Sequence, residues 1–294
     1  MQPWAVIANP LAGRRMIPMD RITGALDAAG VEAVIHPTDS PEEARETIRS
    51  LSRAGQTRFV AAGGDGTANL IANVLLGLDL DVEPTLGILP VGSGCDLLKT
   101  FGISMELDEA AKHLAGDSTY LIDVGVLEGA WGTRYFLNVA QVGVGAAAAE
   151  TAPRIARSLG RARYPIAFGV RLPRFPRAEV KITTERRTYE SKALSVIMAN
   201  APFFAGGWNV APKATLVDGV LDIQIIDAAK SRAPALVPKV IRGTHLRDPA
   251  VRRFSAAEFT IETNPVWPLE ADGDLVGNTT VRGRVMPGAL RLKI

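Results

Sequence analysis

The sequence predicts an α/β protein with an N-terminal domain built on a doubly wound parallel sheet and a C-terminal domain that is a mostly antiparallel β-sandwich. In the first 120 residues, short aliphatic runs alternate with amphipathic helical patterns, and this alternation favours a parallel sheet with helices on both faces. After Tyr120, strand-like segments of alternating polarity follow one another, which is typical of antiparallel sheets. The 294 residues suffice for two domains, and the change of pattern sets their boundary near Asp123.

The strands expected in the N-terminal domain are short and aliphatic, as buried parallel strands are. They are Trp4–Ala8, Val31–His36, Arg58–Ala62 and Leu86–Pro90. The clearest helix begins after Ser40, which can cap free backbone N–H groups while Glu43 reaches back in a capping box. Pro41 stands at the first helical position, where its missing N–H costs no hydrogen bond.

The C-terminal domain is expected to contain strands with a period of two, separated by turn residues. They are residues 120–127, 134–141, 178–184, 188–200, 220–226, 258–262 and 281–293. Two helical insertions are expected to interrupt them, near residues 144–172 and 231–243. Together these segments favour a second domain with its own antiparallel core.

Composition excludes several classes of protein. The net charge of +2 is too small to favour a nucleic-acid partner, and no apolar run approaches the roughly 18 residues of a membrane-spanning helix. The single cysteine, Cys95, cannot form a disulfide within the chain, and the N-terminus lacks the pattern of a signal peptide. We therefore expect a cytoplasmic protein with no transmembrane segment. The sequence does not fix the oligomeric state, and a homodimer stays open.

Three loops follow expected strands of the N-terminal domain and contain glycine. They are Asn9–Gly13, Gly63–Thr67 and Gly92–Asp96. In an open parallel sheet such loops meet at the carboxyl edge of the strands, where ligands bind, and glycine lets the backbone approach a phosphate closely. Asp65 would repel a phosphate, so its carboxylate indicates a contact with a metal ion or a bridging water. The alternative is a tight strand–helix turn with a capping aspartate.

Taken in order, these motifs resemble the diacylglycerol kinase catalytic-domain family, which includes sphingosine kinases, ceramide kinases and soluble bacterial lipid kinases. The segment Gly63-Gly64-Asp65-Gly66-Thr67 is similar to the family signature, and residues 87–96 are similar to its second nucleotide loop. Residues 122–125, 206–222 and 272–274 are similar to the entry to the β domain, a bacterial metal-binding segment and a C-terminal Asp-Gly-Glu. The shared order over nearly the whole chain is more specific than any single motif.

The resemblance implies an ATP-dependent lipid kinase that uses Mg²⁺ to transfer the γ-phosphate to a lipid hydroxyl, such as that of diacylglycerol, at a membrane surface. It implies a nucleotide-binding domain of residues 1–122, rejoined by 286–294, and a lipid-substrate domain of residues 123–285. The implied catalytic residues are Asp274, as the general base, with Asp65 and Asp123. The implied nucleotide contacts are Asn9, Gly13, Thr38, Gly64, Asp65, Gly66, Thr67, Gly92, Ser93 and Asp96. The implied metal ligands are the carbonyls of Thr215 and Val220 and the carboxylate of Asp218.

Three positions depart from the family pattern. Cys95 stands where the second loop usually has asparagine, residues 142–146 lack the family's Phe-Asp, and Asp274 replaces a glutamate. In an extended segment Glu270, Asp272 and Asp274 would share one face, so Glu270 and Asp272 stay open as rival bases. A NAD kinase-like or other small-molecule kinase also stays open, because such enzymes use Gly-Gly-Asp-Gly. So does a non-catalytic nucleotide- or lipid-sensing protein.

One stretch of the C-terminal domain is strongly basic. Residues 153–177 contain seven arginines and no acidic residue, interleaved with apolar side chains. Such a stretch is typical of a surface that meets an anionic membrane. An ordinary solvated arginine face over a normal core is the alternative.

Overall fold

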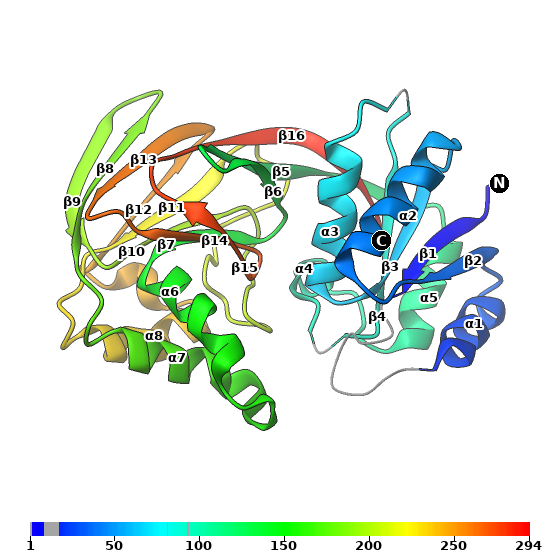
Figure 1. Cartoon of the computed structure of the whole chain (residues 1–294), viewed down its shortest axis with the longest axis horizontal. Helices are drawn as coiled ribbons and strands as arrows, with labels where there is room; N and C mark the ends of the chain where they lie inside the picture. The colour runs from blue at the N-terminus through cyan, green and yellow to red at the C-terminus, as the bar shows by residue number, and fades with distance from the viewer. Residues whose placement is uncertain (1, 9–17, 81, 93) are drawn as a thin grey trace. The chain divides into compact units, whose positions relative to one another are not determined.

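The computed structural model describes residues 2–8, 18–80, 82–92 and 94–294, with the backbone alone for Arg157 and Arg161. The chain forms two compact units, residues 1–123 with 288–294 and residues 124–287, and Figure 1 labels their elements. We call them the N-terminal unit and the C-terminal unit. Strands β5 (Thr119–Gly129) and β16 (Val281–Lys293) contribute residues to both.

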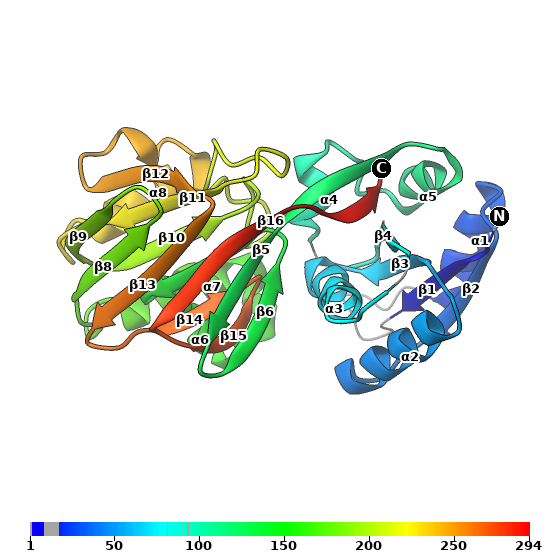
Figure 2. The same ribbon diagram turned by 90° about the horizontal axis from the view of Figure 1, so that it is seen from above.

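The N-terminal unit is a parallel sheet in the order β2-β1-β3-β4, which the end of β16 extends beside β4. Its other strands are β1 (Trp4–Ala8), β2 (Ala33–Pro37), β3 (Arg58–Gly63) and β4 (Thr85–Pro90). Its helices are α1 (Met19–Ala28), α2 (Pro41–Arg53), α3 (Asp65–Leu76), α4 (Asp96–Thr100) and α5 (Leu107–Ala115). Helices α1 and α5 cover one face of the sheet and α2 and α3 the other (Figure 2). The predicted doubly wound parallel sheet is therefore confirmed.

Helix α2 begins where the sequence predicts. The Ser40 hydroxyl accepts a hydrogen bond of 3.1 Å from the Glu43 N–H, while the Glu43 carboxylate accepts one of 2.7 Å from the Asp39 N–H. The capping box thus closes one residue earlier than expected, on Asp39 rather than on Ser40. The first bond satisfies an N–H group that the first turn of a helix leaves free, and the second ties the residue before the N-cap to that turn.

The C-terminal unit contains two antiparallel sheets, in the orders β16-β13-β8-β9 and β12-β11-β10-β7-β14-β15. Its other strands are β6 (Gly132–Phe136), β7 (Val139–Gly143), β8 (Ala178–Thr184), β9 (Thr188–Ala193), β10 (Ser195–Ala199), β11 (Leu221–Ile226), β12 (Val251–Ala256), β13 (Glu258–Asn264), β14 (Pro268–Ala271) and β15 (Asp274–Asn278). Its helices are α6 (Val144–Thr151), α7 (Arg163–Arg171) and α8 (Ala233–Arg242), with short 3₁₀ turns at 152–154, 157–162 and 245–247. Ile182 and Phe259 of the first sheet belong to the same core as Val196 and Ile223 of the second. The predicted β-sandwich is confirmed.

Two predicted strands are each broken into two. Residues 134–141 divide between β6 and β7, because the N–H groups of Leu137, Asn138 and Val139 all donate to the carboxylate of Asp272. Residues 188–200 divide at Leu194 between β9 and β10, which belong to different sheets. Strands β12, β14 and β15 were not expected. Among the described residues, no helix is long and apolar enough to cross a bilayer.

Candidate active-site residues of the two units

Two glycine loops touch at the carboxyl edge of the N-terminal sheet. They follow β3 and β4, which are parallel neighbours, and the Gly92 N–H donates to the Gly63 carbonyl over 3.0 Å. A Cβ on Gly64 would lie 2.7 Å from the Gly94 carbonyl oxygen, and one on Gly92 would lie 2.8 Å from the Gly64 nitrogen. Backbone atoms occupy these positions, so only glycine allows the two loops to approach so closely.

The carboxylate of Asp65 joins these loops. Asp65 is the first residue of α3, and its oxygens accept hydrogen bonds from the backbone N–H groups of Asp96 (2.9 Å) and Leu97 (3.2 Å). It therefore caps α4, the helix that follows the second loop, rather than its own helix. The neighbouring Cys95 thiol is buried, and burial together with the charge of Asp65 raises its pKa. The thiol is therefore protonated at neutral pH and packs as an inert side chain.

The first turn of α3 has room for an anion. The N–H groups of Thr67 and Ala68 both donate to the Gly64 carbonyl, while a Cβ built on Gly66 meets no protein atom within 4 Å. The N-terminus of a helix attracts anions through its free N–H groups and its dipole. The space beside the Gly66 Cα is therefore free of other described protein atoms.

The other predicted residues of this unit lie at strand ends. Thr38 is buried after β2, and its N–H donates to the Ala8 carbonyl at the end of β1 over 2.9 Å. Asp123 is buried on β5, and its Oδ1 accepts a hydrogen bond of 2.9 Å from the Gly288 N–H. Thr38, Gly64, Asp65, Gly66, Thr67, Gly92, Asp96 and Asp123 thus all belong to the N-terminal unit. The predicted contacts Asn9, Gly13 and Ser93 lie outside the described residues.

A tight turn separates the three carboxylates of the C-terminal unit. Strands β14 and β15 pair Ala271 with Asp274, and the two residues between them have positive φ, 48° for Asp272 and 96° for Gly273. This is a two-residue hairpin turn, in which such angles match the twist of the strands. The prediction that Glu270, Asp272 and Asp274 share one face of an extended segment is therefore wrong.

The three carboxylates consequently have three environments. The Asp272 carboxylate is held by the three backbone N–H groups between β6 and β7. Asp274 is exposed and accepts a hydrogen bond of 2.6 Å from Arg134 within an ion pair. Glu270 is fully buried on β14. Its Oε2 accepts a hydrogen bond of 2.8 Å from the Gln141 amide, and its Oε1 accepts one from the Gly273 N–H. Burial, with smaller repulsion from Asp272 and Asp274, raises the pKa of Glu270 to about 8.

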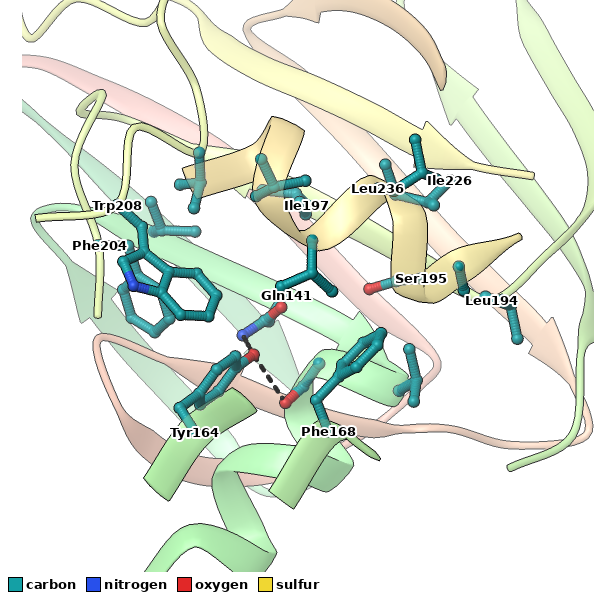
Figure 3. Close-up of a pocket in the computed structure, with 17 residues that line it drawn as sticks. Gln141, Tyr164, Phe168, Leu194, Ser195, Ile197, Phe204, Trp208, Ile226 and Leu236 are labelled. Carbon is teal, nitrogen blue, oxygen red and sulfur yellow. Dashed lines mark hydrogen bonds between the residues drawn. The ribbon is translucent and has the colours of Figure 1, made fainter. Parts of the chain in front are cut away.

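An apolar pocket of about 90 Å³ lies beside Glu270's partner Gln141. Its walls come from β7, β10, β11, α6, α7, α8 and the segment 204–210, and Figure 3 shows Gln141 beside Tyr164 among the lining residues. The Gln141 amide donates a hydrogen bond of 2.9 Å to the Tyr164 hydroxyl. That hydroxyl in turn donates one of 3.1 Å to the Gly145 carbonyl. No sequence motif marks this pocket, because its lining residues come from six separate segments of the chain.

The predicted metal loop lies in the C-terminal unit and is a turn. Asp218 Oδ1 accepts a hydrogen bond of 3.3 Å from the Val220 N–H, and Gly219 between them has φ of 70°. The predicted ligands, one carboxylate and the carbonyls of Thr215 and Val220, are all oxygens, a set that suits Mg²⁺ or Ca²⁺ better than softer metals. Within the described part of the chain, no group of three or more His, Cys, Asp or Glu residues could hold a metal ion.

Two family models match this chain. The diacylglycerol kinase catalytic domain matches residues 3–127, and the YegS C-terminal NAD kinase beta sandwich-like domain matches residues 138–294. The chain therefore belongs to the diacylglycerol kinase family, with a C-terminal domain of the YegS type. At the level of that family it is a lipid kinase.

Individual relatives are similar along most of their length. The chain is 26% identical over 277 residues to a diacylglycerol kinase of Bacillus subtilis (strain 168), covering 92% of this chain and 89% of the relative. It is 26% identical over 266 residues to the protein named "Probable lipid kinase YegS" of Salmonella typhimurium, covering 90% and 87%. A solved diacylglycerol kinase of Bacillus anthracis (strain Sterne) is similar with a TM-score of 0.74 and 20% identity, covering 99% of this chain and 96% of that one. At that identity the structural likeness shows the fold alone.

Proposed function

We propose that this protein transfers the γ-phosphate of ATP to the hydroxyl of a lipid such as diacylglycerol. One observation carries the proposal beyond the family. The C-terminal unit holds an apolar pocket whose polar end is hydrogen-bonded to a buried carboxylate, Glu270, two residues before the Asp-Gly-Asp segment. A hydrocarbon chain that enters such an apolar pocket gains free energy in proportion to the area it buries.

The N-terminal unit is proposed to hold ATP. The two touching glycine loops and the open space at Gly66 suit phosphates, and the backbone of the loops would supply the N–H donors. The contacts are assigned to Thr38, Gly64, Gly66, Thr67, Gly92 and Asp96, with Asn9, Gly13 and Ser93 in the adjoining segments. Asp65 would hold the second loop against the first through α4, so it acts on the nucleotide through the position of that loop.

The reaction requires a proton acceptor. The lipid hydroxyl oxygen forms a bond to the γ-phosphorus while the bond from that phosphorus to the β–γ bridging oxygen breaks, and ADP leaves. The hydroxyl proton passes to a carboxylate, which we assign to Asp274. Its side chain is exposed in the C-terminal unit and ion-paired with Arg134, so it is accessible to a substrate and already oriented. Glu270 is too buried to reach a substrate directly.

Mg²⁺ is proposed as the accompanying metal ion, because it neutralises phosphate charge in phosphoryl transfer. The proposed carboxylates near the chemistry are Asp65 and Asp123. A second ion, held by Asp218 with the Thr215 and Val220 carbonyls, would stabilise the turn in the C-terminal unit. The Asp123 Oδ1 already accepts a hydrogen bond from the Gly288 N–H.

Access to a lipid is proposed to occur from the cytoplasmic side of a membrane. Helix α7 lines the pocket with Tyr164 and Phe168 and exposes Ile166 and Val170 on its other side. Exposed apolar side chains in an arginine-rich stretch suit the interface of an anionic bilayer. Some of these arginines have internal partners, since Arg171 pairs with Glu150.

The test is incubation of the purified chain with γ-labelled ATP, Mg²⁺ and either a total lipid extract or NAD. We expect label in a phospholipid and none in NADP. Label in NADP would establish the NAD kinase-like alternative. Nucleotide binding without transfer to any lipid would establish a non-catalytic sensor.

A further inference from the structure

The hydroxyl groups that line the pocket donate their hydrogens to backbone carbonyls of the protein. Three lining side chains carry oxygen. The Ser195 hydroxyl donates 2.9 Å to the Val142 carbonyl, and the Tyr164 hydroxyl donates 3.1 Å to the Gly145 carbonyl. Gln141, which lies between them, carries the remaining oxygen (Figure 3). Ser195 and Tyr164 can therefore only accept a hydrogen bond from a molecule in the pocket, through their oxygen lone pairs.

Gln141 is fixed so that it, too, offers an acceptor. Its amide nitrogen donates 2.9 Å to Tyr164 and 2.8 Å to Glu270, which uses both of its hydrogens. The side chain is 6% exposed, and among the described residues no group donates to its Oε1. Gln141 lines the pocket, so its Oε1 is available to a molecule that enters it. The indole nitrogen of Trp208 points away from Gln141 in Figure 3.

The surroundings hold the Gln141 carboxamide in this orientation. Glu270 is anchored through its other oxygen to the Gly273 N–H of the hairpin turn. On the other side, a Cβ on Gly145 would lie 1.9 Å from Gln141 Oε1, so the side chain fits only because residue 145 is glycine. The carboxamide therefore fills the space beside Gly145, between Tyr164 and Glu270.

We propose that Gln141 is a specificity-determining residue, which selects an occupant whose hydrocarbon chain carries an O–H or N–H donor near its polar end. A long-chain alcohol, amine or amide donates a hydrogen bond to Gln141 Oε1. An ester or ether oxygen has no hydrogen to donate and faces only acceptor oxygens there. Glu270 and Tyr164 are positioning residues, which set the orientation of the carboxamide. This inference rests on the proposal that the acceptor substrate is a lipid.

The test compares two isomers, decan-1-ol and methyl nonyl ether, which differ in whether the oxygen carries a hydrogen. Calorimetric titration of the full chain, without nucleotide, gives the ratio of the Kd of the ether to the Kd of the alcohol. Since the ratio is compared between variants, the difference in hydration of the two isomers cancels. Gln141→Leu is expected to lower the ratio by roughly 3- to 10-fold, the value of one hydrogen bond.

Two further variants keep the test decisive if Gln141→Leu does not fold. Tyr164→Phe frees one Gln141 N–H, which can then donate to the ether, so the ratio should fall while the side chain of Gln141 remains. Gly145→Ala should displace the carboxamide and lower the ratio as well. Gly169→Ala on α7, where a Cβ meets no atom within 4 Å, should leave it unchanged.

A ratio that Gln141→Leu, Tyr164→Phe and Gly145→Ala all leave unchanged would overturn the inference. Phosphoryl transfer measured on the same preparations separates the two proposals. Donor-selective binding without any lipid phosphorylation refutes the proposed function alone. Lipid phosphorylation with a Kd ratio that the variants leave unchanged refutes the role of Gln141 alone.

Discussion

The carboxylate of Asp65 accepts a hydrogen bond of 2.9 Å from the backbone N–H of Asp96, thirty-one residues further along the chain. This bond, with a second one from Leu97, ties the start of α3 to the start of α4. These bonds fix the start of α3 against the start of α4, and we expect a substitution in one glycine loop to affect the other.

We expect Asp65→Asn to reduce both stability and phosphoryl transfer. The amide keeps one acceptor oxygen but turns an NH₂ group toward the second N–H, so the free energy of unfolding should fall by about 1 kcal/mol. Asp20→Asn is the matched control, because Asp20 is an exposed acid in the first turn of α1. Urea unfolding and an assay of both variants measure the effects. Unchanged stability in Asp65→Asn would show that the capping bonds contribute nothing.

Gly66→Ala separates a phosphate site from a plain turn. The new methyl group meets no protein atom within 4 Å, and alanine favours a helix by up to about 1 kcal/mol over glycine, so stability should hold or rise. If a phosphate lies against this backbone, ATP affinity should fall by about tenfold or more, a loss of roughly 1.4 kcal/mol. Gly24→Ala in α1 has equal room and should leave affinity intact. Calorimetric ATP titration decides, and full affinity in Gly66→Ala would refute a phosphate at this position.

The pKa of Glu270 predicts how stability depends on pH. Burial raises that pKa from 4.5 to about 8, so the folded state holds its proton more tightly than the unfolded chain. The stabilisation is complete below pH 4.5 and is lost as the pH rises toward 8. The groups that face Glu270 are Gln141, the Gly273 N–H, Asp272 and Asp274.

Glu270→Gln should therefore make the unfolding free energy depend less on pH between pH 5 and 8. One titrating group changes that free energy by at most about 1.4 kcal/mol for each pH unit. Urea unfolding at several pH values measures it. The wild type should lose stability over this range relative to the variant. Parallel profiles for the two proteins would show that Glu270 is ionised throughout.

Much of the fold could be predicted, because buried parallel strands and amphipathic helices leave strong local patterns. The hairpin at Asp272 and Gly273 has a local signal, because Asp-Gly between two strand-like segments favours a two-residue turn, and the expectation of one extended segment overlooked it. The division between β6 and β7 depends on a carboxylate more than 130 residues away. The glycine loops were found because close backbone approach requires glycine, whereas the pocket around Gln141 is assembled from side chains with no fixed spacing.

Membrane association should depend on the exposed side of α7. Val170 is 56% exposed, and a charge there would oppose insertion into the interface. Val170→Asp should weaken binding to vesicles that contain phosphatidylglycerol, as measured by co-sedimentation. Val266→Asp is the control, because Val266 is also exposed, at 64%, but lies on the loop before β14. Equal losses in the two variants would mean that α7 has no special part in binding.

The most direct test of the central claim is transfer of labelled γ-phosphate from ATP to diacylglycerol by the wild type and by Asp274→Asn. Asp274 is exposed and paired with Arg134, so the substitution should leave the fold intact. In Asp272→Asn, by contrast, the acceptor of three backbone N–H groups is weakened. We predict labelled phosphatidic acid from the wild type, and in Asp274→Asn a kcat lowered about 10²-fold with ATP affinity unchanged. No labelled lipid from the wild type, or full turnover in Asp274→Asn, would contradict the account.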